Sequence, residues 1–494
     1  MSRGLRALAD WDLALYRRAA RTNTPLLDRT LPRLTRSANH GALWLAVAAG
    51  LAASGGRRRR RAAVRGLASL AVASAAANVP GKLTARRPRP QLLPVPLPRQ
   101  LLRQPTTSSF PSGHAASAAA FAIGVGLEYP VLAVPVGVAA AGVAYGRVYT
   151  GVHYPGDVLA GVALGAGAAW AVSRVWPLRP EQPAVAGPAR FQAPAVTDGG
   201  GLVVVLNESA GAGARADEIE AELTAALPAC EVIRCTAQHD LADLMRAAAA
   251  RARVLGVAGG DGTVNCAAGF AMSAGVPLAV LPGGTLDHFA AELGISSVQD
   301  VVEALAAGSA VQVTVGSAEA DGDGLVFLNT FALGVYPDLV REREKREAAL
   351  GKWPALVLAM FVVLRRAKPV FVEVDGRPRR LWTLFAGNGH YHPAGFAPSW
   401  RERLDDGCID VRTIDADAPF SRTRLIVAVI SGRLGRCRVY EQRIVAKLAI
   451  RTRQGALHLA RDGEVAEGPG HLNLHAAGEP LVVYRLPPRD RRLA

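Results

Sequence analysis

The first 176 residues contain five long stretches without a charged side chain, and these stretches limit what this part of the chain can fold into. An apolar helix of about 20 residues spans a bilayer, and small residues let membrane helices pack closely. The pattern therefore predicts an all-α bundle of membrane helices over residues 37–176. A soluble all-α bundle is the alternative, because some stretches are shorter than a membrane span. The stretches, all rich in Ala, Gly, Val and Leu, are 37–56, 66–81, 104–127, 129–146 and 158–173.

Charge is distributed unevenly between the two parts of the chain. Residues 1–180 hold 23 Lys and Arg but only 5 Asp and Glu, whereas residues 181–494 hold 34 and 36. Because the basic part is also the apolar part, we expect a membrane with anionic headgroups as its partner, and not nucleic acid. The basic, amphipathic segment 1–36 could lie in the membrane interface or form an ordinary surface helix. All five Cys lie beyond residue 181 without metal-ligand spacing, which favours a reducing compartment.

The run Arg57–Arg61 predicts an orientation, since clustered positive charges stay on the cytoplasmic side of a membrane. Counting the five stretches as crossings places the loops 82–112 and 147–156 together on the opposite face. Residues from 177 onward then return to the cytoplasm. The eight Arg before residue 37 conflict with this count, so the placement of the first 36 residues stays open. We expect a multi-pass protein of the plasma membrane.

Three polar motifs interrupt the apolar half. Lys-x6-Arg-Pro begins at Lys82, Pro-Ser-Gly-His covers 111–114, and Arg-x5-His-x3-Asp runs from Arg147 to Asp157. A carboxylate beside one imidazole nitrogen fixes the tautomer and frees the other nitrogen to attack, and guanidinium groups suit phosphate. The segment 111–114 would start a helix, whose free N–H groups bind anions. Taken alone, the last motif could instead be a loop with an N-capping Asp and an Arg that snorkels to the membrane surface.

In this order, with helices between them, the three motifs resemble the type-2 phosphatidic acid phosphatase superfamily over about residues 35–176. The resemblance implies that His153 is a nucleophile that forms phosphohistidine, that Asp157 orients it and that His114 protonates the leaving alcohol. The family usually has Ser where this chain has Gly146, which removes one phosphate donor. No cofactor or metal is expected for this chemistry. The implied phosphate-binding residues are Lys82, Arg89, Ser112, Gly113 and Arg147.

Beyond a Pro-, Ala- and Gly-rich linker at 177–200, the pattern changes to alternating strands and helices, which predicts a parallel α/β lobe over 201–310. Short strands dominate 311–494 and predict a β-rich second lobe. The apolar run 353–364, followed by three cations, is either a core helix or a bilayer contact. The strands expected in the first lobe are 202–206, 231–235 and 254–258, with helices at 215–227 and 238–252. Those expected in the second are 325–331, 370–375, 381–387, 408–414, 444–450 and 481–485.

A glycine-rich turn follows the buried strand 254–258 and precedes a helix. Glycines there let backbone N–H groups approach phosphates closely. The ends of parallel strands line one crevice, in which nucleotides bind. Other polar residues end the first and fourth strands, so the sequence predicts one nucleotide site at these strand ends. Its residues are Asn207, Gly259, Gly260, Asp261, Gly262, Thr263, Gly284 and Thr285.

These segments, together with Leu328–Thr330, Asp405–Gly407 and Asp462–Glu464, resemble the diacylglycerol kinase catalytic family over about residues 201–488. The resemblance implies a two-lobed kinase, an α/β nucleotide-binding lobe and a β-sandwich lobe, with ATP and Mg²⁺ between the lobes and a homodimer formed through this domain. It implies that Asp462, supported by Glu464, takes the proton of the lipid hydroxyl. A plain Asp-Gly hairpin turn is the alternative for Asp462. The implied metal ligands are Asp261, Asp287 and Asp406.

The sequence therefore predicts a multidomain, bifunctional lipid enzyme. A membrane phosphatase acts on a lipid phosphate or diphosphate, and a cytoplasmic kinase phosphorylates a lipid alcohol on the opposite face. The chain has Asp287-His288 where the kinase family more often has Asn-Asp. This difference motivates an alternative in which the second part is a non-catalytic nucleotide or lipid sensor. A soluble phosphatase of small phosphates is a third hypothesis.

Overall fold

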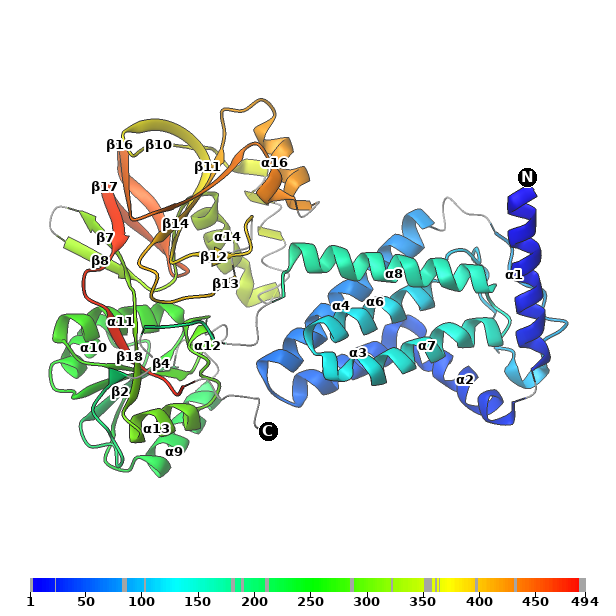
Figure 1. Ribbon diagram of the computed structural model, residues 1–494, viewed down its shortest axis with the longest axis horizontal. Helices are drawn as coiled ribbons and strands as arrows, with labels where there is room; N and C mark the ends of the chain where they lie inside the picture. The colour runs from blue at the N-terminus through cyan, green and yellow to red at the C-terminus, as the bar shows by residue number, and fades with distance from the viewer. Residues whose placement is uncertain are drawn as a thin grey trace. The chain divides into compact units, whose positions relative to one another are not determined.

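The computed structural model divides into two compact units, Met1–Leu178 and Arg179–Ala494, which are described separately. Figure 1 shows a helical first unit and a mixed second unit in which a helix-covered sheet is followed by a β-rich lobe. The residues that the structure describes are 3–22, 24–81, 87–101, 104–178, 183–187, 191–208, 213–284, 288–320, 323–350, 358–359, 362–363, 365–395, 399–430 and 433–487.

The first unit is a helical bundle, as predicted, and each of the five charge-free stretches contributes to one of its helices. Three of its helical segments are long and apolar enough to cross a membrane, namely Arg58–Gly81, Pro130–Tyr149 and Pro155–Val175. The α-helices of the unit are α1 (Arg3–Arg21), α2 (Pro25–Ser37), α3 (Ala42–Ala53), α4 (Arg57–Ala76), α6 (Gly113–Glu128), α7 (Ala133–Tyr149) and α8 (Pro155–Val175).

Glycines allow α6 and α8 to touch along their backbones. A Cβ atom on Gly161 would lie 2.5 Å from the carbonyl oxygen of Ser112, and one on Gly165 would lie 2.4 Å from that of Ala116. No side chain fits at such a separation, so the small residues of α8 are required for this packing. The contact also fixes the segment at Ser112, which precedes α6, against the first turns of α8.

The two polar loops lie at the same end of the bundle. Ser109 N–H donates to the carbonyl of Arg87 at 3.0 Å, and Ser112 N–H donates to that of Asp157 at 2.9 Å. At the other end, Arg65 pairs with the buried Glu128 at 2.7 Å and donates to the carbonyl of Trp176 at 2.7 Å. The loops are thus separated from the Arg57–Arg61 run by the length of the helices.

Helices α1 and α2 pack against the loop end of this bundle. Tyr16 Oη on α1 donates to the carbonyl of Gln91 at 2.7 Å, and Arg99 Nε pairs with Asp28 of α2 at 2.5 Å. Tyr16, Ala19 and Ala20 are buried. The first 36 residues, whose placement the sequence left open, are therefore an integral part of the first unit.

The second unit begins with a seven-stranded sheet in the order β1-β6-β18-β5-β4-β2-β3. Strands β2, β4 and β5 are buried along almost their whole length, as is typical of parallel strands covered on both faces. The strands are β1 (Phe191–Gln192), β2 (Leu202–Asn207), β3 (Glu231–Cys235), β4 (Val254–Gly259), β5 (Leu278–Pro282), β6 (Ser309–Val313) and β18 (Leu481–Tyr484). The helices are α9 (Gly213–Ala226), α10 (Leu241–Ala249), α11 (Asp261–Ala274), α12 (His288–Glu292) and α13 (Val298–Ala306).

Two details of this sheet differ from the sequence prediction. Strand 481–484 was expected in the second lobe but lies in the first sheet, antiparallel to β6 and parallel to β5. An apolar strand pattern shows that a strand is buried but not which sheet it joins. Part of the expected linker is also bound to this unit, since Ala184 N–H donates to Glu292 O at 2.8 Å and Gly187 N–H to Gln312 O at 3.0 Å.

The β-rich lobe is a nine-stranded antiparallel sheet in which β9 and β10 each pair with β11 and with β16, at opposite ends of these long strands. Its strands are β7 (Gly316–Ala320), β8 (Asp323–Phe327), β9 (Thr330–Gly334), β10 (Val370–Val374), β11 (Arg377–Asn388), β14 (Ile409–Asp415), β15 (Tyr440–Val445), β16 (Lys447–Arg461) and β17 (Glu464–Ala476). A small hairpin, β12 (Tyr391–His392) and β13 (Trp400–Arg401), and the helices α14 (Val335–Leu350) and α16 (Ser421–Ile430) complete it.

Two strands expected in this lobe, 325–331 and 444–450, are each divided into two. The first is interrupted between β8 and β9, where the N–H groups of Leu328 and Asn329 donate to a carboxylate of Asp462 instead of to a neighbouring strand. The second is interrupted between β15 and β16. Hydrogen bonding to a residue more than 130 positions away has no local signal in the sequence.

Two candidate active sites

The first candidate site is centred on His153, in the loop between α7 and α8. Asp157 caps the start of α8, since its Oδ2 accepts the N–H of Tyr154 at 3.0 Å, and the same oxygen lies 3.7 Å from His153 Nδ1. The other ring nitrogen, Nε2, lies 3.4 Å from Arg89 Nη1. The imidazole therefore directs Nδ1 towards a carboxylate and Nε2 towards a guanidinium.

Two arginines flank His153. Arg89 Nη1 donates to the carbonyl of Val152 at 2.7 Å, and Arg147, which is only 2% exposed, contacts Thr35 Oγ1 at 3.3 Å. Burial lowers the pKa of His153, and the two guanidinium groups lower it further, against the opposing effect of Asp157. A neutral imidazole keeps a lone pair on one nitrogen, as a nucleophile requires.

The Pro-Ser-Gly-His segment lies beside this loop. The backbone of Ser112 is held by Asp157, as described above, and Gly113 and His114 form the first turn of α6. His114 Nε2 is 2.9 Å from Asn39 Oδ1. Lys82 lies outside the described residues. The structure thus brings together Arg89, Ser112, Arg147, His153 and Asp157, with His114 two residues beyond Ser112.

Three buried polar atoms in this group have no hydrogen-bond partner among the described residues. They are Ser112 Oγ, Arg147 Nε and His153 Nδ1. Leaving a buried polar group unpaired costs about 1–3 kcal/mol, and such groups are usually satisfied by water, an ion or a ligand. The Ser112 hydroxyl and the Arg147 guanidinium fit an anion with several acceptor oxygens, whereas His153 Nδ1 faces Asp157 Oδ2 at 3.7 Å.

The second candidate site lies at the ends of the parallel strands. The Gly259-Gly260 turn leads into α11, and Asn207 Nδ2 at the end of β2 donates to Thr263 Oγ1 at 2.9 Å. A Cβ atom on Gly283 would lie 2.8 Å from the nitrogen of Gly259, so the ends of β4 and β5 touch. Gly284 is buried in the loop after β5, and Thr285 lies outside the described residues. The described ends of β2, β4 and β5 therefore lie next to one another, and the nucleotide site at these ends stays a prediction.

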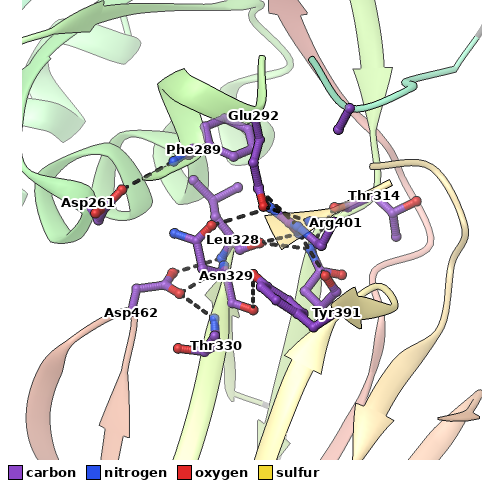
Figure 2. A network of polar contacts seen from close by, with 12 residues as sticks. Asp261, Phe289, Glu292, Thr314, Leu328, Asn329, Thr330, Tyr391, Arg401 and Asp462 are labelled. Carbon is purple, nitrogen blue, oxygen red and sulfur yellow. Dashed lines mark hydrogen bonds and ion pairs between the residues drawn. The ribbon is translucent and has the colours of Figure 1, made fainter. Parts of the chain in front are cut away.

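Asp462 occupies the turn between β16 and β17, with a φ of +47° followed by +92° at Gly463. It is a hairpin turn, yet its carboxylate is buried and faces inward (Figure 2). Oδ2 accepts the N–H of Leu328 at 2.8 Å, and Oδ1 accepts those of Asn329 at 2.8 Å and Thr330 at 2.7 Å. Burial raises the pKa of Asp462 to about 6, although these N–H groups oppose the rise.

Glu464 connects Asp462 to the glycine turn. A Cβ atom on Gly262 would lie 2.0 Å from Glu464 Oε1, so the carboxylate packs directly on the glycine backbone. At the start of α11, Asp261 Oδ1 accepts the N–H of Phe289 at 3.3 Å (Figure 2). The carboxylates at 261 and 464 thus both lie at the glycine turn, and the turn that carries Asp462 begins β17 beside them.

Asp406 lies elsewhere in the lobe, where its Oδ2 accepts the N–H of His390 at 2.9 Å. Among the described residues, no three His, Cys, Asp or Glu side chains are close enough together to hold one metal ion. Asp287 is outside those residues. Because one of its three members is not described, the set Asp261, Asp287 and Asp406 stays a prediction.

Comparisons with known proteins find a family match in each of the two units. The PAP2 superfamily model matches residues 62–181, and the diacylglycerol kinase catalytic domain model matches residues 201–318. A decaprenylphosphoryl-5-phosphoribose phosphatase of Mycobacterium tuberculosis is 34% identical over 152 residues, which are 30% of this chain and 80% of that protein. The chain belongs to the PAP2 superfamily through its first unit. Its second unit carries a diacylglycerol kinase catalytic domain.

Two solved structures match parts of the chain at low similarity. A diacylglycerol kinase from Bacillus anthracis str. Sterne matches with 18% identity and a TM-score of 0.40, over 61% of this chain and 99% of that chain. A transmembrane PAP2 type phosphatidylglycerolphosphate phosphatase from Bacillus subtilis matches with 24% identity and a TM-score of 0.28, over 34% of this chain and 85% of that chain.

In the first unit, sequence reasoning missed Arg87, which binds Asp157, and Asp12, which binds Arg87. Arg87 Nη1 donates to Asp157 Oδ1 at 2.8 Å, and its Nη2 donates to Asp12 of α1 at 2.6 Å. Asp12 also accepts the N–H of Gly156 at 2.7 Å. The sequence offered one signal for Arg87, which is its position two residues before Arg89 of the first motif. It offered none for Asp12, because nothing in the sequence connects α1 to α8.

In the kinase domain, the missed residues support the loop that donates to Asp462. Arg401 is 3% exposed and donates to the carbonyls of Leu328 at 2.9 Å and Asn388 at 2.6 Å. Its Nε donates to Glu292 of α12 at 3.0 Å, which connects the two lobes (Figure 2). An ion pair that is this buried is retained only with good geometry and satisfied hydrogen bonds.

Proposed function

We propose that the chain is a bifunctional lipid enzyme, a metal-independent lipid phosphate phosphatase joined to an ATP-dependent lipid kinase. The phosphatase proposal is carried by the buried, unpaired Ser112 Oγ and Arg147 Nε, which belong to the segments beside His153 at one end of the helix bundle. Cations beside a desolvated imidazole stabilise the charge that a phosphoryl group develops during transfer.

The geometry favours His153 Nε2 as the nucleophile, because Nδ1 faces Asp157. Nε2 forms a bond to phosphorus as the bond from phosphorus to the lipid oxygen breaks, and His114 gives its proton to that oxygen. Water then attacks the phosphohistidine while His114 takes a proton back, and inorganic phosphate leaves. Asp157 keeps the Nδ1–H tautomer, as a carboxylate does in other imidazole sites. We assign Lys82, Arg89, Arg147 and the start of α6 to phosphate binding.

Thr35 is proposed to compensate for the missing serine at Gly146. A Cβ on Gly146 would lie 3.3 Å from Thr35 Cβ, and Thr35 Oγ1 is 3.3 Å from Arg147 Nη1. Thr35→Val removes this hydroxyl, which is expected to lower phosphatase kcat/KM about tenfold, since a hydrogen bond to a charged group contributes roughly 1.5–3 kcal/mol. Phosphate release from a lipid phosphate measures this, and the exposed Thr30→Val on the same helix is the control. Equal rates in both variants would contradict the role of Thr35.

An apolar cavity supports a lipid substrate for the phosphatase. It has a volume of about 330 Å³ and lies between α3 and α7, where Trp44, Val47, Leu51 and Val136 are among its lining residues. Helix α3 follows Asn39, whose side chain contacts His114. A lipid tail in this cavity would therefore lie along the helix that leads away from the catalytic histidines.

The relative from Mycobacterium tuberculosis directs us to a specific substrate class. Its name describes the removal of phosphate from a decaprenylphosphoryl phosphoribose, and its 34% identity covers most of its length. We propose a prenyl-linked sugar phosphate as the substrate here. Phosphate release from this compound should exceed release from phosphatidic acid or phosphatidylglycerol phosphate, measured with the detergent-purified full chain. A preference for either glycerolipid would refute the assignment of substrate while leaving the phosphatase activity in place.

The kinase proposal is carried by the buried Asp462, whose raised pKa of about 6 suits a general base near neutral pH. The glycine turn and the start of α11 would receive the phosphates of ATP, with Asn207 and Thr263 beside them. Asp261, at the first turn of α11, offers the hard oxygen that Mg²⁺ prefers, and Asp287 is the second carboxylate we assign to it. Bound Mg²⁺ would neutralise phosphate charge. Asp462 would accept the proton of the lipid hydroxyl, with Glu464 in support.

Transfer of labelled γ-phosphate from ATP to extracted lipid by the full chain tests the kinase. Loss of transfer in Asp261→Ala would support the nucleotide site, and nucleotide binding without transfer would support the sensor alternative. We also propose that the two sites act on opposite faces of the plasma membrane, as the crossing count predicts. Reporter fusions that placed residues 150–154 and 259–263 on the same side would refute this.

A further inference from the structure

An exposed aromatic residue precedes α16 in the kinase domain. Phe420 is 80% exposed and has a φ of +56°, which is rare for a residue other than glycine, asparagine or aspartate. On the following helix, Val427 is 59% exposed. Such strain and apolar exposure are usually retained for contact with another molecule.

Cations surround these apolar side chains. Residues 353–371 and 418–439 together hold eight Lys and Arg and no Asp or Glu. We define the α16 surface as the exposed residues of these two segments. It comprises the apolar Leu358, Phe371, Phe420 and Val427 and the cations Arg365, Arg366, Lys368, Arg424, Arg433, Arg436 and Arg438.

The two segments form one continuous surface. Arg422 donates to the carbonyls of Arg365 at 3.1 Å and Ala367 at 2.5 Å, and Ser421 Oγ accepts the indole N–H of Trp382 at 3.0 Å. Beneath them, side chains from both segments share one buried apolar cluster that includes Val363 and Leu425. The exposed side chains of both segments are therefore supported by one hydrophobic cluster.

This surface is also close to the proposed kinase site. Val335, at the start of α14, packs against the same apolar cluster. It directly follows β9, whose first residue, Thr330, donates to Asp462. A strand of five residues spans roughly 15 Å, so the α16 surface lies about the length of β9 from Asp462, the proposed general base.

We propose that the α16 surface docks on the anionic headgroups of a lipid bilayer. Apolar side chains ringed by Lys and Arg are the composition that binds at a membrane interface, where each cation adds to the attraction. The PAP2 domain already anchors the polypeptide in a membrane. Neither segment contains Asp or Glu, which fits a negatively charged lipid surface. The role of this docking in lipid phosphorylation rests on the proposed kinase activity. The docking itself can be measured without that activity.

Photo-crosslinking tests the docking on the full chain. The protein is reconstituted in phosphatidylcholine nanodiscs, with or without phosphatidylglycerol, that carry a lipid with a photoreactive acyl chain. Adducts are expected in residues 418–430 and to increase several-fold with phosphatidylglycerol. Arg424→Glu/Arg436→Glu should reduce these adducts at least about tenfold, whereas Arg246→Glu/Arg377→Glu, two exposed arginines elsewhere in the domain, should not.

Adducts confined to the helices of the PAP2 domain would overturn the proposal. So would a change in oligomeric state in Arg424→Glu/Arg436→Glu with unchanged adducts, because the surface would then bind protein. If crosslinking succeeds while the wild type transfers no phosphate to lipid, docking stands and the proposed kinase activity fails.

A second inference concerns α1, which lies before the matched PAP2 region. Asp12 is buried and binds both Arg87 and the N–H of Gly156, so it contacts the two groups adjoining Asp157. A Cβ on Gly156 would lie 2.9 Å from Asp12 Oδ2, so the Asp12 carboxylate packs directly on the backbone of Gly156. We infer that Asp12 is a positioning residue, which acts through Arg87 to hold Asp157 against His153.

Asp12→Asn should lower phosphatase kcat about tenfold with little change in KM, because phosphate binding does not involve Asp12. Asp10→Asn, an exposed acid on the same helix, is the matched control. Kinase activity of the same polypeptide reports the amount of protein in each assay. An unchanged kcat in Asp12→Asn, or a change in KM alone, would refute the positioning role. Absence of phosphatase activity in the wild type would refute the proposed function instead.

Discussion

Replacing His153 by alanine is expected to lower the turnover of lipid phosphate by about 10⁴-fold or more, because removal of a nucleophile leaves only binding and electrostatic stabilisation. The imidazole is buried, its Nε2 lies 3.4 Å from Arg89 Nη1, and Arg147 also lowers its pKa. No other described imidazole occupies that position, since His114 is held at Asn39. The rate of phosphate release by detergent-purified enzyme measures the loss.

The same polypeptide supplies the control for this variant. Lipid phosphorylation by the kinase domain of His153→Ala should equal that of the wild type, which shows that equal amounts of the polypeptide are compared. A labelled lipid phosphate should leave acid-labile phosphohistidine on quenched wild-type enzyme and none on His153→Ala. Turnover by His153→Ala at the wild-type rate would refute the histidine mechanism.

Much of the fold could be predicted because the two parts of the chain have different sequence patterns. Apolar stretches without charge specify helices, and the buried runs of β2, β4 and β5 specify a parallel sheet. The pairing partner of β18 and the attachment of residues 183–187 could not be predicted. Both depend on hydrogen bonds between segments more than 100 residues apart, for which a local pattern contains no information.

The residues of the candidate sites could be predicted where they lie close together in a sequence motif. They could not be predicted where they come from distant parts of the sequence. His153 and Asp157 are four residues apart, so their contact follows from a helix start. Asp12 and Arg401 lie far in the sequence from the segments that they contact. No motif distinguishes them from other charged residues, and only the fold places them beside the candidate sites. The support of a site is therefore harder to predict than its reacting groups.

Asp462 and Asp375 show what sequence alone leaves undecided. Each is followed by glycine in a hairpin turn with a φ of +47°. Asp375 is exposed and its Oδ1 accepts the N–H of Ala449 at 3.0 Å, whereas Asp462 is buried and accepts three N–H groups. The dipeptide predicts the turn in both places. Only the neighbouring loop at Leu328–Thr330 determines which carboxylate can act as a base.

Asp462→Asn is therefore expected to lower kinase kcat by about 10³-fold, as loss of a general base does, while Asp375→Asn leaves it unchanged. Phosphatase activity of both variants should remain at the wild-type level. An exposed carboxylate titrates near pH 4, but burial raises the pKa of Asp462 to about 6. Since only the ionised form accepts a proton, wild-type kcat/KM should rise with pH up to about 6 and level off above it. A profile flat from pH 5 to pH 8, or equal loss in both variants, would show that another group takes the proton.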